Sequence, residues 1–250
     1  MKKIKIKLLL IFLSLLFCFS ACGSKKNLTA ALQKPNETKK LNLSRSGLTA
    51  VPPEVRELKN LEELNLFKNK ITELPGWIGE LTQLKRLTVS SNKLTTIPPE
   101  IGNLKQLERL TLKYNNITHL PEEIGQLTNL EELELQSNEL SSLPATIGDL
   151  KNLKDIYLER NYLKTLPSSI GYLKNLERLS VGKNQLVELP IEIGDLIRLR
   201  ELNLADAGAM LYIPESIVNL SRLELLIVDR HSKLPYSINS INPRLKVVVR

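Results

Sequence analysis

The chain has 250 residues, of which 42% are hydrophobic and 25% are charged, a balance typical of a folded protein rather than a disordered one. Lysines and arginines outnumber aspartates and glutamates by 35 to 27, but residues 1–40 hold nine of the basic side chains and a single acid, so residues 41–250 are neutral. A neutral body argues against a nucleic-acid partner, because phosphate binding needs a surplus of basic side chains along one face. Both cysteines, Cys18 and Cys22, lie near the N-terminus, and only two histidines occur, which excludes a cysteine nucleophile in the body and disfavours acid–base catalysis.

Residues 1–21 have the pattern of an export signal. Four lysines in residues 1–7 precede a largely apolar stretch over residues 8–19, and small residues follow at positions 20 and 21. A helix over that apolar stretch would rise only about 18 Å, less than the ~30 Å of a bilayer core, so a cleaved signal is favoured over a permanent span. We therefore expect the protein to be exported.

The residues Phe19, Ser20, Ala21 and Cys22 resemble a bacterial lipobox, in which a signal peptidase cuts before the cysteine and acyl chains are attached to it. The resemblance implies that Cys22 anchors the protein to the membrane of the bacterial cell envelope, at the outer membrane or cell surface; two or more acyl chains give stable anchoring. Phe19 departs from the aliphatic residue usual at its position. An ordinary cleaved signal, with a secreted or periplasmic product, is the alternative.

Residues 22–37 are expected to hold this lipidated cysteine, a tether and a short capping helix. The helix is predicted over residues 27–34, with Asn27 as its capping residue and Pro35 as its stop. The lysines of this stretch either lie near anionic headgroups or belong to a solvated tether.

The rest of the chain, residues 38–250, repeats with a fixed period. Prolines recur at 52, 75, 98, 121, 144, 167 and 190, and glycines at 79, 102, 125, 148, 171 and 194. Such a period indicates a stack of similar units, each of which buries its apolar side chains against its neighbours. Asparagines follow the same step and are expected to form a structural ladder that satisfies backbone groups at each bend: Asn69, Asn92, Asn115, Asn138, Asn161 and Asn184.

The fifth repeat shows what each part of the unit does. Leu133 and Leu135 alternate with Glu134, which predicts a short strand with one buried face. Pro144 suits the first position of a helical turn, and Gly148 is expected to end that turn in a left-handed conformation. The unit is therefore a strand, a bend and a short helical or 3-10 return.

The pattern LxxLxLxxN followed by xLxxLPxxIGxLxx resembles the leucine-rich repeat, in the 23-residue class of plant intracellular Ras-group and Ras-suppressor-like proteins. Together with the lipobox, it resembles the leucine-rich-repeat lipoproteins of bacterial envelopes. The resemblance implies an α/β solenoid of about nine repeats, curved, with parallel strands on its concave face and helical or 3-10 turns on its convex face. It also implies protein binding as the shared activity.

The variable residues of the strands would form ladders on the concave face, and these include a basic zone, an acidic zone and aromatic residues. Such a patch is a candidate protein-binding centre, because tyrosine and arginine are favoured interface anchors. The alternative is solvated charge that pairs across strands, as Arg109 and Glu132 would. The candidate ligand-binding residues are Phe67, Arg86, Arg109, Lys113, Tyr114, Glu132, Glu134, Asp155, Tyr157, Glu159 and Arg178.

We expect no catalytic residue and no cofactor. Glu132, Glu134 and Asp155 supply carboxylates, but an open sheet offers no water-excluding pocket to raise the pKa of one of them. Their spacing does not match a calcium loop, so no metal is expected either. The predicted function is a non-catalytic scaffold that binds a protein, which is a host or matrix protein or another envelope protein.

A structural or glycan-associated envelope component, acting through the convex face or the final strand over residues 245–249, is the alternative function. Trp77 on the convex side is either a second contact or a packed side chain. The irregular repeats over residues 200–250 are either a ligand site or an irregular C-terminal cap.

Overall fold

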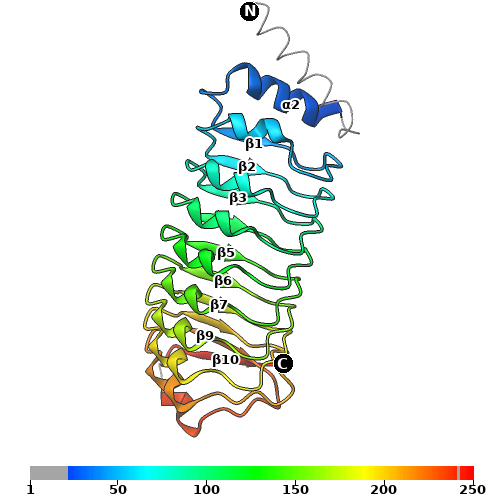
Figure 1. Ribbon diagram of the computed structural model, residues 1–250. Coiled ribbons are helices and arrows are strands. Elements are labelled where there is room, and N and C mark those ends of the chain that lie inside the picture. The colour runs from blue at the N-terminus through cyan, green and yellow to red at the C-terminus, as the bar shows by residue number, and fades with distance from the viewer. Residues whose placement is uncertain (1–21, 241–242) are drawn as a thin grey trace, which may run out of the picture.

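The repeating unit of the sequence folds into one coil of a solenoid, and the coils stack in chain order (Figure 1). The computed structural model describes residues 22–240 and 243–250; the expected export signal over residues 1–21 lies outside them. The strands are β1 (Lys40–Asn42), β2 (Glu63–Asn65), β3 (Arg86–Thr88), β4 (Arg109–Thr111), β5 (Glu132–Glu134), β6 (Asp155–Tyr157), β7 (Arg178–Ser180), β8 (Glu201–Asn203), β9 (Leu225–Val228) and β10 (Lys246–Val249). The 3-10 turns are η1 (Pro53–Glu57), η2 (Gly76–Glu80), η3 (Pro99–Asn103), η4 (Glu122–Gln126), η5 (Ala145–Asp149), η6 (Ser168–Tyr172), η7 (Ile191–Asp195), η8 (Glu215–Asn219) and η9 (Tyr236–Ser240).

The strands form one parallel sheet in the order of the chain. Pairing follows the sequence period, so Leu64 lies opposite Leu87, which lies opposite Leu110 and then Leu133. The sheet runs along the whole stack and is only slightly curved (Figure 1). The predicted solenoid of parallel strands and 3-10 turns is therefore confirmed.

A single apolar core runs through the stack. In the coil that begins with β5, the side chains of Leu133, Leu135, Leu140, Ile147 and Leu150 are fully buried. One such unit cannot bury enough apolar surface by itself, so the coils depend on their neighbours for stability. Because the coils are alike and stacked, the strand residues that alternate with the buried leucines form a regular array on the outer side of the sheet.

The ladder asparagines join each bend to the preceding coil. The Asn138 side-chain oxygen accepts a hydrogen bond from the Ile117 N–H over 3.1 Å, and its amide nitrogen donates to the carbonyl oxygens of Leu112 and Leu135 over 3.2 and 2.9 Å. Ser137, just before it, has a φ of 57°, so the bend places a residue other than glycine in the left-handed region. Asparagines 69, 92, 115, 161 and 184 make the same set of bonds.

The expectation for Gly148 is wrong, and that for Pro144 is displaced by one position. Gly148 is not among the described residues with positive φ; the only glycine in that class is Gly47. A Cβ atom at Gly148 would lie 2.4 Å from the Ser169 carbonyl oxygen in the next coil, so this glycine is required for close packing between turns. Pro144 precedes the turn η5 as its N-cap, and its carbonyl oxygen accepts a hydrogen bond from the Ile147 N–H over 3.1 Å.

A helix, α2 (Cys22–Gln33), covers the first coil, and its residue Leu28 is fully buried (Figure 1). The expected helix over residues 27–34 is wrong at its start, since the structure begins it at Cys22. Lysine is a good helix former, so the lysines before Asn27 extend the helix instead of forming a tether. Asn27 lies inside the helix, and its side-chain amide donates to the Asn42 carbonyl oxygen over 3.0 Å. None of the helices in the described part of the chain is long and apolar enough to cross a membrane.

The last coils depart from the regular step. Leu202 pairs with Leu226, one position later than the period predicts, which accommodates one inserted residue, and Leu226 pairs with Val247. The final strand expected over residues 245–249 is present as β10. On the opposite side of the stack, Trp77 is partly buried and packs against the core.

Candidate functional site

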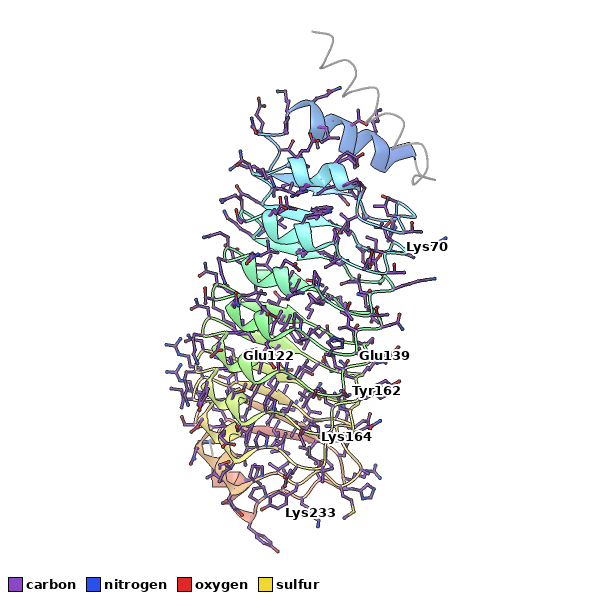
Figure 2. All side chains as sticks on the ribbon, viewed as in Figure 1. Lys70, Glu122, Glu139, Tyr162, Lys164 and Lys233 are labelled. Atoms are coloured by element: carbon purple, nitrogen blue, oxygen red, sulfur yellow. The ribbon has the colours of Figure 1, made fainter. Side chains whose placement is uncertain are left out.

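The outer side of the sheet, called the strand face below, carries the side chains on either side of each buried strand leucine. All the candidate ligand-binding residues lie on this face or on the bend beside it. Tyr114 belongs to the bend, with a φ of 58° and 56% of its surface exposed. Other surfaces of the stack are marked by Glu122, which belongs to η4, and by Glu139 and Tyr162, which lie at the opposite margin from Glu122 (Figure 2).

The predicted basic and acidic zones are in direct contact. Arg109 Nε lies 2.6 Å from Glu132 Oε2, and Lys113 forms an ion pair with Glu134. Thr111 also donates a hydrogen bond to Glu134, over 3.3 Å. The basic side chains of β4 and its bend therefore neutralise one edge of the acidic residues on β5.

A second set of contacts holds the other edge of the acidic zone. Arg178 on β7 donates from Nη2 to Asp155 Oδ2 over 2.6 Å and from Nε to the Tyr157 hydroxyl over 3.2 Å. Ser180 donates to Glu159 Oε1 over 2.5 Å. The acidic residues of β6 and its bend are thus paired toward β7, on the side away from β5.

The strip between these two sets of contacts, called the β5–β6 seam, consists of Glu132, Gln136, Asp155, Tyr157 and Glu159. Glu132 is directly opposite Asp155 in the sheet, so two acids face each other across it. Asp155 Oδ1, Glu159 Oε2 and Gln136 Oε1 are buried and have no hydrogen-bond partner among the described residues. Only 8% of the surface of Asp155 is exposed.

The electrostatics of the seam follow from this burial. Burial raises the pKa of the Glu132 carboxyl; Arg109 opposes the effect, whereas Glu134 and Asp155 reinforce it. Burial also raises the pKa of the Tyr157 phenol. One ion pair, Lys154 Nζ to Glu131 Oε1 at 2.9 Å, crosses between these coils, but it lies at the rim, before the strands.

A shallow hollow of about 120 Å³ lies where the strands β3 to β6 begin. At roughly 30 Å³ per water, it has room for about four water molecules, or for the head group of a side chain. Its lining mixes acids and bases: Arg86, Glu108, Arg109, Glu131, Glu132, Lys154 and Asp155. Within residues 22–240 and 243–250 no group of three or more histidines, cysteines or acids is arranged to hold a metal ion.

Three of the candidate residues, Phe67, Arg86 and Tyr114, take no part in the side-chain contacts among β4 to β7, although Arg86 lines the hollow. Arg86 pairs with Glu63, which also contacts Lys40 over 2.7 Å, and the ring of Phe67 has the Arg45 guanidinium 6.0 Å from its centroid. The structure therefore groups Arg109, Lys113, Glu132, Glu134, Asp155, Tyr157, Glu159 and Arg178.

Sequence reasoning missed Gln136. It left the irregular repeats over residues 200–250 open as a ligand site or a cap, and a second hollow of about 350 Å³ lies there, lined by Asp206, Asp229, Arg230 and His231 among others. Gln136 occupies the ladder position of Lys113 and Glu159, so the period of the sequence could have placed it on the strand face. Gly208, in the repeat that departs from the regular step, also lines this hollow.

Comparisons with known proteins agree with this architecture. A family model described as a leucine-rich repeat region matches residues 12–114 and 100–186. The solved structure of an LRR protein of Leptospira interrogans is 34% identical in sequence, with 89% of this chain and 69% of that chain covered and a TM-score of 0.64. No curated protein sequence matches the chain.

Two further solved structures are also similar. The structure titled PEPR1–AtPEP1 is 27% identical, with 94% of this chain and 36% of that chain covered and a TM-score of 0.68. The plant peptide hormone receptor RGFR1 in complex with RGF2 is 26% identical, with 84% of this chain and 44% of that chain covered and a TM-score of 0.55. This chain thus spans less than half of the length of either of those two chains.

Proposed function

Because the chain belongs to the leucine-rich-repeat family, whose members are generally non-enzymatic interaction scaffolds, we propose that it binds a protein or peptide through its strand face. The observation that carries the proposal is the β5–β6 seam, where buried acceptors without partners lie beside Tyr157 on a rigid sheet. A plant peptide hormone receptor with the same fold was solved in complex with RGF2, which supports a peptide as one class of partner.

The two faces of the solenoid offer a matched pair of tyrosines to test this proposal. Tyr157 is half-buried on the strand face, whereas Tyr172, at the end of η6, is 57% exposed on the opposite side. Peptides selected from a random display library against the full chain should lose binding on Tyr157→Ala, because a large, rigid anchor is removed. The same peptides should bind Tyr172→Ala as they bind the wild type.

The reverse result would reject the strand face. Selected peptides that depend on Tyr172, or a selection that enriches no binder, would favour a structural or glycan-associated component acting through the convex side or the β10 edge. A second matched pair is Arg109→Ala, which should weaken binding of the selected peptides, and Arg198→Ala, which should not. The exposed Arg198 lies away from the seam, and its guanidinium donates to Asn175 over 2.7 Å.

We further propose that the protein is exported and anchored in a bacterial envelope by acylation of Cys22. The support is the charge and apolar pattern of residues 1–21 and the lipobox-like residues that end in Cys22. In cells grown with a labelled fatty acid, Cys22→Ser should abolish labelling and shift the protein to the soluble fraction. Cys18→Ser should leave both unchanged; label retained in Cys22→Ser would reject the anchor.

A further inference from the structure

The acceptors without partners in the β5–β6 seam fall into two groups along the strand direction. Asp155 Oδ1 lies at the start of β6, beside the hollow that Glu132 also lines. Gln136 Oε1 and Glu159 Oε2 lie just beyond the ends of β5 and β6. Tyr157 separates the two groups.

A buried acceptor that makes no hydrogen bond destabilises the folded protein. An ionised carboxylate oxygen without a donor costs more than a neutral group, because desolvation of the charge is not offset. The nearby cations are already engaged, since Arg109 is paired with Glu132 and Arg178 with Asp155 Oδ2 and Tyr157. A ligand that brings its own N–H donors would satisfy all three atoms.

The chemistry of these atoms selects the ligand. Phosphate-bearing partners would be repelled by the carboxylates, and the described residues form no metal-binding cluster. A guanidinium presents five N–H donors in a planar fork and forms strong, charge-assisted bonds with carboxylates. Asp155 and Glu159 are four positions apart on an extended coil, so their backbone positions are separated by roughly 13 Å at about 3.3 Å per residue.

We propose that the β5–β6 seam binds two basic side chains, preferably arginines, spaced four positions apart in an extended segment of a protein partner. One arginine bonds to Asp155 at the hollow, and the other bonds to Glu159 and Gln136. The residue midway between them packs on the ring of Tyr157. This inference rests on the proposed strand-face function and adds the chemistry of its partner.

Synthetic peptides test the proposal directly on the full chain. The probe is a fluorescein-labelled Arg-Gly-Val-Gly-Arg peptide, and binding is followed by fluorescence polarisation. One control peptide replaces both arginines by citrulline, which has a similar shape but no charge; another carries the two arginines side by side. We expect the arginine peptide to bind at least about tenfold more tightly than either control.

Protein variants locate the binding. Asp155→Asn and Glu159→Gln should each weaken binding of the arginine peptide by roughly tenfold, because each removes one charge-assisted bond. Glu201→Gln is the matched control, since Glu201 lies on the same ladder as Asp155 but three strands from β5. Its affinity should stay within about twofold of the wild type, and a cooperative thermal melt should verify that each variant is folded.

The results that would overturn the inference are distinct from those that would overturn the proposed function. Equal binding of the citrulline peptide, or equal weakening by Glu201→Gln and Asp155→Asn, would exclude specific recognition at the seam. If display-selected peptides depend on Tyr157 but lack basic residues and ignore Asp155→Asn, the strand face remains the binding face and only its basic preference is wrong. If selected peptides ignore both Tyr157 and Asp155, both proposals fail.

Discussion

Replacing Asn138 by alanine isolates the contribution of one rung of the asparagine ladder. The side chain bonds to three backbone groups, the Ile117 N–H and the carbonyl oxygens of Leu112 and Leu135. Each carbonyl also accepts a bond from a neighbouring asparagine of the ladder, so it keeps one partner in the variant. The Ile117 N–H donates to Asn138 and to no other group among the described residues, and it alone becomes a buried group without a partner.

A buried N–H without a partner costs about 1–3 kcal/mol, so Asn138→Ala should lower the free energy of unfolding by that amount. Urea unfolding measures it, provided that the slope with denaturant is unchanged and the loss is seen as a shift of the midpoint. Asn116→Ala is the control, because the exposed Asn116 side chain bonds to the Glu139 side chain and should contribute within about 0.5 kcal/mol. If the two variants unfold at the same urea concentration, the ladder does not hold the coils together as argued.

Three further predictions concern packing and pH. Gly148→Ala should lower the melting temperature, since its Cβ would lie 2.4 Å from the Ser169 carbonyl oxygen and overpacking costs roughly 1–3 kcal/mol; an unchanged melt would contradict the close approach. Hydrogen bonds, first from Lys39, lower the pKa of Glu62 to about 2, so its stabilisation is complete above the ordinary value of 4.5 and is lost as the pH falls through 2. Acid melts should show this loss in the wild type and less of it in Glu62→Gln. Binding of the arginine peptide should weaken as the pH falls through the raised pKa of Glu132, because protonation removes a negative charge; polarisation titrations of Glu132→Gln should show a flatter pH profile.

The register of the sheet follows from the sequence because a fixed period leaves no freedom in the pairing of strands. Leu110 and Leu133 are one period apart and are directly paired, so the ladders of the strand face could be predicted residue by residue. The role of Gly148 could not be predicted, because a single sequence does not distinguish a glycine that avoids a clash from a glycine that adopts positive φ. The start of α2 could not be predicted, since Cys22 and the lysines after it suit either a helix or a tether.

For the candidate site, the sequence predicts which residues share a face but not how their side chains pair. A ladder that contains Arg109, Glu132, Asp155 and Arg178 allows each acid to bond toward either neighbour. The structure directs Glu132 toward β4 and Asp155 toward β7, and the seam is what remains between them. That choice depends on rotamers and local burial, which the repeat pattern does not contain.

The seam offers a last test, because stability and binding should change in opposite directions there. Gln136 occupies the rung beside Glu159, and both carry a buried acceptor without a partner among the described residues. Gln136→Lys would place a cation beside Glu159 and supply the donor that the proposed ligand brings. The variant should therefore melt at a higher temperature and bind the arginine peptide more weakly, whereas the same change at the exposed Gln106, Gln106→Lys, should change neither. Tighter peptide binding by Gln136→Lys would contradict a cation-accepting seam, since an added positive charge would then assist the peptide instead of competing with it.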